Sequence, residues 1–411
     1  MRLLTVLVCV VCMCTLTFGE WESIGPYGGY LWSVVASPTD SNVVWVMSYS
    51  TPTKIAQSTD GGASWSTIGS LSEGYVQQMV VDAIDANRLY AAGGNYVHHS
   101  SDGGVNWAYT HLIDCYFWGI TVHPTMTDVV FGVGTKFESG SSDMSVHKST
   151  NGGVDWTSTV LYDGATYSYG RGVAIAYSNP DIIYACGYTI DVDIIPLVYK
   201  STDGGATFED ITSNLPTGFY LYAVGVHPAN PDIVYLGGST GIYRSTDGGA
   251  TWINQHYAAS NYTMVTTPLN ADLVYCGSYN SIYKSTDAGE TWTDCGTGLE
   301  GYDWRGVAIC SFDPSIAYAG NPVGFFKTED SGITWFESNN DLNLASIYNF
   351  AMSPISTPLL YTSCEEVGVF MTTDHGTSWE KLPTPVTCGN ICEFAINPLN
   401  PQVILGLEGM G

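Results

Sequence analysis

The chain has 411 residues, of which 45% are hydrophobic and only 12% are charged, and its formal net charge is −27. Twelve basic residues against 39 acidic ones leave no basic stripe to meet phosphates, which argues against nucleic acid and anionic membranes as partners. The low density of charge also excludes a disordered acidic tail.

Residues 1–19 predict a secretory signal peptide. Arg2 is followed by an apolar run from Leu3 to Thr17, and small residues precede a cleavage point near Glu20. The run is short for a membrane span, and no later stretch is long enough to cross a bilayer. We therefore expect a monomeric protein that is secreted or held at the cell surface, without membrane insertion. Its mature chain would carry 11 basic and 39 acidic residues, a net charge of about −28.

Eight cysteines remain after this cleavage. Three of them follow the tyrosine of a recurring strand and are expected to be buried as small apolar residues, namely Cys186, Cys276 and Cys364. Cys388 and Cys392 are close enough in sequence to form a local disulfide. No CxxC pair suggests zinc, so we expect neither a metal nor another cofactor.

One short motif occurs eight times, first as Ser58-Thr59-Asp60-Gly61-Gly62-Ala63-Ser64-Trp65. Asp-Gly-Gly between two β-prone runs predicts a hairpin turn, because Gly adopts positive φ without a Cβ clash and Asp accepts hydrogen bonds from the turn amides. An aromatic residue ends each copy and should bury its ring beside the turn. The acidic or amide positions of the eight copies are Asp60, Asp102, Asn151, Asp203, Asp247, Asp287, Asp330 and Asp374.

The copies are 40 to 52 residues apart, which indicates a repeat architecture. Between them lie short β-prone runs with turn residues at their ends, such as 223–228 and 242–244. Four such runs per repeat predict an all-β fold, a β-propeller of four-stranded blades, with eight complete blades and a partial ninth. We expect the eight turns to lie together on the outer rim.

The two ends of the chain extend this pattern, so we treat residues 20–411 as one propeller. Residues 21–25 match the strand that follows the first turn, and residues 391–407 match the first two strands of a ninth unit. We expect Trp21 to Ile24 to pair beside the strand that contains residues 403–407. The abrupt end at residue 411 also favours a fragment truncated at its C-terminus.

The loop that leads from one blade to the inner strand of the next should border the central funnel. These loops are aromatic in nearly every repeat, and two of them carry arginines in Tyr-Gly-Arg-Gly and Asp-Trp-Arg-Gly. Aromatic faces and the planar donor fork of Arg suit sugars, peptide side chains and carboxylates. The candidate ligand-binding residues are Arg171, Arg305, Tyr169, Tyr302, Trp304, Trp118 and Tyr222. In the competing interpretation the tyrosines only pack the blades together, and an acid such as Asp303 neutralises each arginine.

The repeated motif resembles the Asp-box (BNR) repeat, with Asn151 and Phe208 as mild departures. In the Asp-box families these turns are structural and lie at the blade periphery. Sialidases need an arginine triad that begins with Arg-Ile-Pro, and this chain lacks that tripeptide. The resemblance is closer to xyloglucanase-type hydrolases, which use two aspartates between two propellers. Sortilin-like domains and the photosystem II assembly propeller, which are binding proteins, share the same repeats.

The sequence therefore favours an exported, non-catalytic propeller that binds a protein or a polysaccharide through its funnel face. The alternative is a fragment of a glycoside hydrolase that resembles xyloglucanases. Its acid and base would come from the funnel-loop carboxylates Asp114, Asp163, Asp303 and Glu300, since two carboxylates roughly 6–10 Å apart can perform inverting hydrolysis.

Overall fold

The computed structural model describes residues 29–408 apart from residues 139, 164–166, 259, 340–346, 353–358, 365–367, 374–378, 383–390 and 397–403. Its described elements are all β-strands, joined as antiparallel sheets in which consecutive strands are neighbours. Eight of the sheets have four strands and one has two. The prediction of an all-β fold built from four-stranded blades is therefore confirmed. Within the described residues there is no helix of the length and apolarity needed to cross a membrane.

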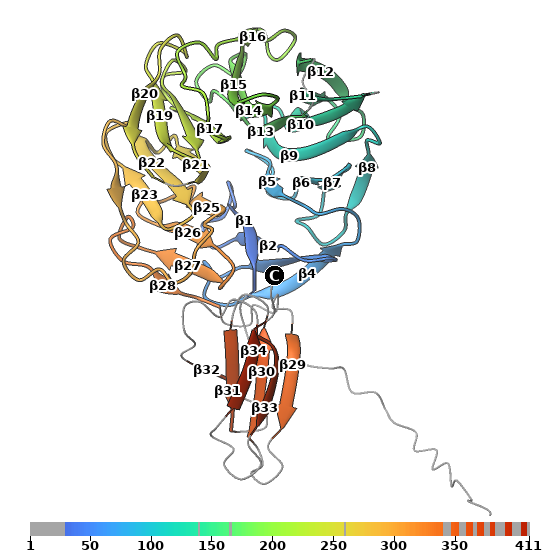
Figure 1. Cartoon of the computed structure of the whole chain (residues 1–411), viewed down its shortest axis with the longest axis vertical. Coiled ribbons are helices and arrows are strands. Elements are labelled where there is room, and N and C mark those ends of the chain that lie inside the picture. The colour runs from blue at the N-terminus through green and yellow to red at the C-terminus, as the bar shows by residue number, and fades with distance from the viewer. Residues whose placement is uncertain are drawn as a thin grey trace, which may run out of the picture.

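Seven of the four-stranded sheets are arranged around a common axis as the blades of a propeller (Figure 1). The first strand of each blade lies nearest the axis. These inner strands are β1 (Leu31–Ala36), β5 (Gln78–Val81), β9 (Cys115–Val122), β13 (Tyr167–Ile175), β17 (Leu221–Val226), β21 (Asn261–Thr267) and β25 (Gly306–Ile309).

The second strands lie between neighbouring blades and are almost completely buried, which explains their runs of apolar and small residues. They are β2 (Val44–Ser48), β6 (Leu89–Gly93), β10 (Val130–Glu138), β14 (Ile183–Ile190), β18 (Val234–Gly238), β22 (Asn270–Ser278) and β26 (Ala317–Gly320). Cys186 and Cys276 are fully buried in two of these strands, as the sequence predicts.

The third strands end at the Asp-containing turns. They are β3 (Thr53–Ser58), β7 (Tyr96–Ser100), β11 (Ser141–Ser149), β15 (Ile194–Ser201), β19 (Gly241–Ser245), β23 (Ile282–Ser285) and β27 (Phe325–Thr328). The short, exposed fourth strands complete the blades: β4 (Ser66–Leu71), β8 (Ala108–His111), β12 (Thr157–Tyr162), β16 (Glu209–Asp210), β20 (Ile253–His256), β24 (Thr293–Asp294) and β28 (Phe336–Glu337).

The ring closes after seven blades, which corrects the expected ring of eight blades and a partial ninth. The amide of Leu31 donates to the carbonyl of Asn321 at 2.9 Å, and Trp65 Nε1 donates to the carbonyl of Ser338 at 3.0 Å. A Cβ placed on Gly306 would lie 3.1 Å from the amide nitrogen of Val34, so blade 7 approaches blade 1 as closely as glycine allows. The number of repeats in the chain therefore does not set the number of blades in the ring.

The remaining strands lie outside this ring (Figure 1). They form an eighth four-stranded sheet and a separate hairpin, with the bounds β29 (Ile347–Met352), β30 (Leu360–Cys364), β31 (Gly368–Thr372), β32 (Glu380–Lys381), β33 (Ile391–Ile396) and β34 (Ile404–Glu408). β34 pairs with β33. Residues 21–24 lie outside the described residues, as do Cys388 and Asp374, and the predictions made for them stay predictions.

The Asp-containing turns of the seven blades share one hydrogen-bond pattern. In the fifth blade Asp247 Oδ1 accepts the amide of Thr251 at 2.8 Å and the hydroxyl of Ser245 at 2.8 Å, while Oδ2 accepts the Thr251 hydroxyl at 2.6 Å. Asn151 keeps the same pattern through its Oδ1, which accepts the amide of Asp155 at 2.9 Å. The predicted local role of the motif is thus confirmed for the seven turns that the structure describes.

Each turn also bonds to the loop between the first two strands of its own blade, as in the Gly61 amide that donates to the Asn42 carbonyl at 2.8 Å. In an antiparallel blade that loop lies at the end opposite the blade-to-blade loops. The turns therefore occupy the opposite face of the ring from the residues that precede the inner strands. We call the face of the turns the box face.

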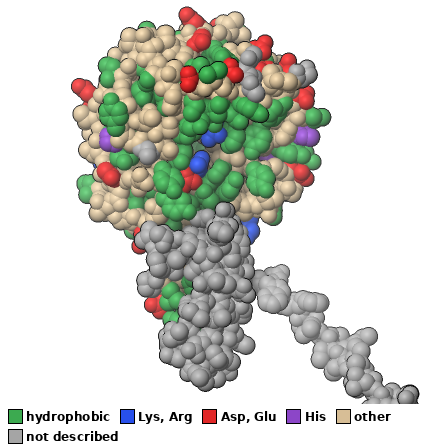
Figure 2. All heavy atoms as spheres, in the orientation of Figure 1, with side chains coloured by type: hydrophobic (Ala, Val, Ile, Leu, Met, Phe, Trp, Pro, Cys, Tyr) green, Lys and Arg blue, Asp and Glu red, His purple; other side chains and the backbone are tan. Residues whose placement is uncertain are grey.

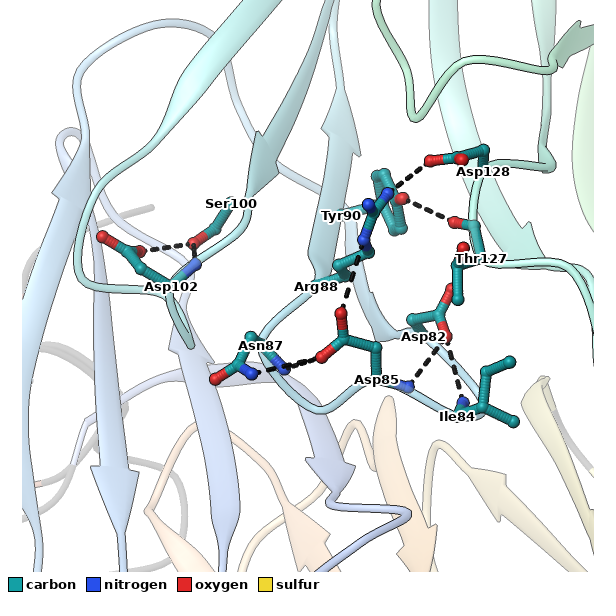
Figure 3. Close-up of polar contacts among 10 residues, drawn as sticks. All are labelled: Asp82, Ile84, Asp85, Asn87, Arg88, Tyr90, Ser100, Asp102, Thr127 and Asp128. Carbon is teal, nitrogen blue, oxygen red and sulfur yellow. Dashed lines mark hydrogen bonds and ion pairs between the residues drawn. The ribbon is translucent and has the colours of Figure 1, made fainter.

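Polar contacts between blades also gather near the box face (Figure 3). Arg88 pairs with Asp85 at 3.4 Å within blade 2 and with Asp128 of blade 3, and Tyr90 donates its hydroxyl to the Thr127 carbonyl at 3.0 Å. Asp82 Oδ1 caps the turn after β5 by accepting two amides at 3.0 Å each. The contacts of Arg88 with Asp128 and of Tyr90 with Thr127 join blade 2 to blade 3.

Candidate functional site

A channel of about 730 Å³ runs along the axis of the ring and is lined by the inner strands of all seven blades. Most of the residues that line it have apolar side chains, but polar atoms make up more of the exposed wall than apolar atoms do. Figure 2 shows hydrophobic side chains around the central opening and basic side chains within it. Among the described residues that line the channel, the basic ones are Arg171 and Arg305 and the acidic one is Asp82.

One residue from each blade meets at the mouth of this channel, on the face opposite the box face. We call these seven residues the channel belt. In chain order they are Trp32, Gln77, Trp118, Arg171, Tyr222, Tyr262 and Arg305. All seven are half-buried.

β-Bulges explain why these side chains reach the channel. In five inner strands the register to the second strand skips one residue, and that residue is the belt residue: Trp32, Trp118, Arg171, Tyr222 and Tyr262. A bulge leaves one residue out of the ladder and redirects its side chain. The repeated fold therefore presents one variable side chain per blade at the same height of the channel.

Each belt arginine lies between aromatic rings of the two neighbouring blades. The guanidinium carbon of Arg171 is 4.0 Å from the ring centre of Trp118 and 5.5 Å from that of Tyr222. The guanidinium carbon of Arg305 is 4.7 Å from the ring centre of Trp32 and 4.1 Å from that of Tyr262. Cation–π attraction of this kind fixes the direction of both side chains.

The two arginines differ in whether a carboxylate neutralises their charge. Nε of Arg305 donates to both carboxylate oxygens of Asp303, at 2.9 and 3.0 Å, and Oδ2 of the same carboxylate accepts the hydroxyl of Tyr30 at 2.9 Å. Arg171 has Tyr169 two positions earlier, where Arg305 has Asp303. No carboxylate in the described part of the chain forms an ion pair with Arg171. The competing interpretation, a neutralised arginine, thus applies to Arg305 and not to Arg171.

Burial shifts the pKa of the arginine and tyrosine side chains at the mouth of the channel. It lowers the pKa of Arg171, and the nearby Arg305 cation also lowers it, yet a guanidinium stays charged at neutral pH. Burial raises the pKa of the surrounding tyrosines, which are therefore neutral hydroxyl donors: Tyr30, Tyr49, Tyr116, Tyr188, Tyr222 and Tyr262.

A wider set of aromatic rings surrounds the belt. Tyr49 stacks on Trp32 with ring centres 3.8 Å apart, and Tyr188 lies 4.9 Å from Tyr220, centre to centre. Tyr279 lies 5.5 Å from Tyr302. Sequence reasoning missed Tyr49, Tyr188 and Tyr279. Tyr49 and Tyr279 directly follow the second strand of their blades, and Tyr188 lies near the end of β14. The hairpin that joins strands two and three lies at the same end of the blade as the blade-to-blade loop.

The structure separates the predicted site residues into three groups. Arg171, Arg305, Trp118 and Tyr222 meet in the channel belt. Tyr169 and Tyr302 lie farther out and contact the neighbouring rings of Tyr188 and Tyr279.

Trp304 is fully buried in the core beside Phe326 and does not line the channel. Trp304 directly precedes the belt residue Arg305, just as the fully buried Leu31, Phe117 and Leu221 directly precede belt residues in other blades, so this position belongs to the core.

The candidate carboxylates do not gather in the channel. Asp303 has a side chain only 7% exposed and is held by Tyr30 and Arg305. Asp114, Asp163 and Glu300 are exposed and lie outside the channel wall. The acidic residue of the described wall, Asp82, lies at the other end of β5 and caps a turn. Among the described residues no His, Cys, Asp or Glu cluster suited to a metal ion is present.

No protein-family model and no curated protein matches this chain. Its fold is similar to solved structures of GH74 enzymes. These include the GH74 enzyme of Niastella koreensis, with 16% identity over 86% of this chain and 78% of that one and a TM-score of 0.34. An ancestral GH74 enzyme shares 15% identity over 94% and 75% of the two chains, with a TM-score of 0.41. The GH74 xyloglucanase of Xanthomonas campestris shares 14% identity over 87% and 78%, with a TM-score of 0.36.

Proposed function

We propose that this protein is an exported, non-catalytic propeller that binds a polysaccharide through the mouth of its central channel. The observation that carries the proposal is the channel belt, in which seven equivalent positions hold four aromatic residues, two arginines and a glutamine. A fold that needs only packing at these positions has no reason to place half-buried aromatic and cationic side chains around an open channel.

The chemistry of the mouth suits a chain of sugar rings. Aromatic faces such as those of Tyr222 and Tyr262 offer apolar surfaces for stacking, and the neutral tyrosine hydroxyls beside them offer hydrogen bonds to sugar hydroxyls. Peptide side chains could also stack on these aromatic faces and bond to these hydroxyls. Binding to a peptide is therefore the other outcome of the test below.

The positions of the carboxylates support the hydrolase alternative less well. Hydrolysis of a glycosidic bond needs two carboxylates that face one substrate. The described channel wall carries one acid, Asp82, and its Oδ1 already accepts two turn amides. Asp303 is committed to Tyr30 and Arg305.

A glycan array tests the proposal, with an array of peptides as the second arm. We expect the wild-type protein to bind at least one class of polysaccharide and Tyr222→Ala to weaken that binding at least tenfold. Tyr109→Ala is the matched control, since Tyr109 is an exposed tyrosine on the fourth strand of blade 2 and lies outside the channel wall. Equal losses in both variants, or binding to peptides alone, would contradict the proposal.

A further inference from the structure

Of the two belt arginines, within the described residues Arg305 is paired with a carboxylate and Arg171 is not, which identifies Arg171 as a binding position for an anion. We propose that Arg171 binds the carboxylate of an isolated uronic acid residue within a largely neutral polysaccharide. This inference rests on the proposed function and names the chemical group that the site selects.

Arg171 is the uncompensated cation of the mouth. Arg305 shares its charge with Asp303 through Nε contacts of 2.9 and 3.0 Å. Arg171 has Tyr169 in the position of that acid, and within the described chain no side-chain or backbone acceptor bonds to its guanidinium. One positive charge is thus left without a counterion on the channel wall, half-buried between two aromatic rings, where a carboxylate would interact strongly with it.

The aromatic neighbours of Arg171 hold the side chain without using its donors. Trp118 and Tyr222 contact the guanidinium through their ring faces at 4.0 and 5.5 Å. The N–H groups lie in the plane of the guanidinium, and a contact with an aromatic face forms no hydrogen bond to them. The fork is therefore both positioned and free to donate two parallel bonds to a carboxylate.

The charge around the site favours a ligand with few charges. With a net charge of −27, the protein repels a strongly acidic peptide or a densely charged polyanion. A single uncompensated arginine within a ring of neutral aromatic residues instead matches one carboxylate flanked by neutral sugar rings. The belt glutamine, Gln77, adds a neutral donor and acceptor and no charge.

The test uses oligosaccharides in matched pairs, each uronic acid compound beside its carboxyl-reduced counterpart, with acidic peptides as a further arm. Binding is measured by calorimetry for the wild type, Arg171→Met and Arg88→Met. Met keeps much of the length of Arg between the two rings, and Arg88→Met removes the same charge outside the channel. Thermal melting of all three proteins establishes that they are folded.

We expect the wild type and Arg88→Met to prefer the uronic acid member of a pair by about ten- to hundredfold, the range for a hydrogen-bonded charge pair. Arg171→Met should bind both members equally. Equal binding of the two members by the wild type overturns the inference and leaves the proposed function standing. A preference that survives in Arg171→Met also overturns it. Binding to no glycan contradicts the proposed function itself, and binding to acidic peptides alone replaces the ligand class. If Arg171→Met does not fold, the comparison of the paired ligands on the wild type still decides.

Discussion

Tyr30 donates its hydroxyl to Oδ2 of Asp303 at 2.9 Å, although the two residues are 273 positions apart in the chain. The contact joins the entrance of blade 1 to the entrance of blade 7, and Asp303 simultaneously holds Arg305. The buried carboxylate of Asp303 thus links blade 7 to blade 1 and neutralises the belt arginine Arg305.

Removing this contact should weaken the closure. We expect Tyr30→Phe to lower the free energy of unfolding by about 1.5–3 kcal/mol, because it removes a hydrogen bond to a charged, buried acceptor. Urea denaturation followed by tryptophan fluorescence measures the change. Tyr220→Phe is the control, since the Tyr220 hydroxyl bonds to no protein group in the described chain. A loss of the same size in the control would show that the Asp303 contact contributes nothing specific.

The Asp-containing turns should contribute to stability and not to binding. Asp247→Ala removes the acceptor for the Thr251 amide and hydroxyl and should cost about 0.5–2 kcal/mol, in the range of lost helix caps. Asp247→Asn should cost less, because Asn151 keeps the equivalent turn in blade 3. Thermal melting and glycan binding of both variants provide the measurement. Weakened binding with unchanged melting would contradict this structural role.

Acid should destabilise the same turns. Hydroxyl donation from Thr207, Thr251 and Thr334 is the largest effect that lowers the pKa of Asp203, Asp247 and Asp330 to about 2. An unfolded Asp has a pKa of about 3.9. The stabilisation from these carboxylates is therefore complete above about pH 4 and is lost as the pH falls toward 2.

Melting temperatures recorded from pH 5 to pH 2 follow this loss. We expect a steady fall below pH 4 that is shallower in Asp247→Asn, which has no carboxylate to protonate at that turn. Parallel curves for the two proteins would mean that Asp247 does not contribute to the acid sensitivity.

The buried cysteines should be inert in the folded protein. Burial raises the pKa of Cys115 to about 11 and that of Cys186 and Cys295 to about 12, and the thiolate is the reactive form. We expect iodoacetamide at pH 8 to leave these three unmodified until denaturant is added, with peptide mapping by mass spectrometry as the readout. Modification of Cys186 at the rate of a free thiol would show that its strand opens in solution.

Local chemistry made the turns predictable from the sequence. The bonds of Asp247 reach only two residues back and four residues forward, so the motif itself contains both partners. The strand order within a blade follows for the same reason, because consecutive strands pair through short connections. Closure after seven blades depends on how closely β1 and β25 approach, and that is a property of side-chain packing across the whole ring.

The site was predictable only in part. The shared position of Arg171 and Arg305 before a glycine identified the arginines, and the nearby Asp303 suggested a neutralised one. A bulge turns the side chain of Arg171 into the channel, whereas Arg305 precedes β25, which pairs with β26 without a shift in register. No residue pattern in the sequence predicts that bulge. Trp304 lies in the core because it occupies the position directly before a belt residue, which Leu31, Phe117 and Leu221 fill in other blades.

Every blade of the ring is made from one unbroken stretch of chain, and the seam between β1 and β25 is bridged by side chains and single backbone bonds instead of a shared sheet. The seam thus resembles the six other blade junctions in that the two blades which meet there belong to separate sheets. New termini could be cut at any loop between blades, with the original ends joined by a linker, and no sheet would be split. The circular order of the blades carries the fold, and the position of the first residue does not.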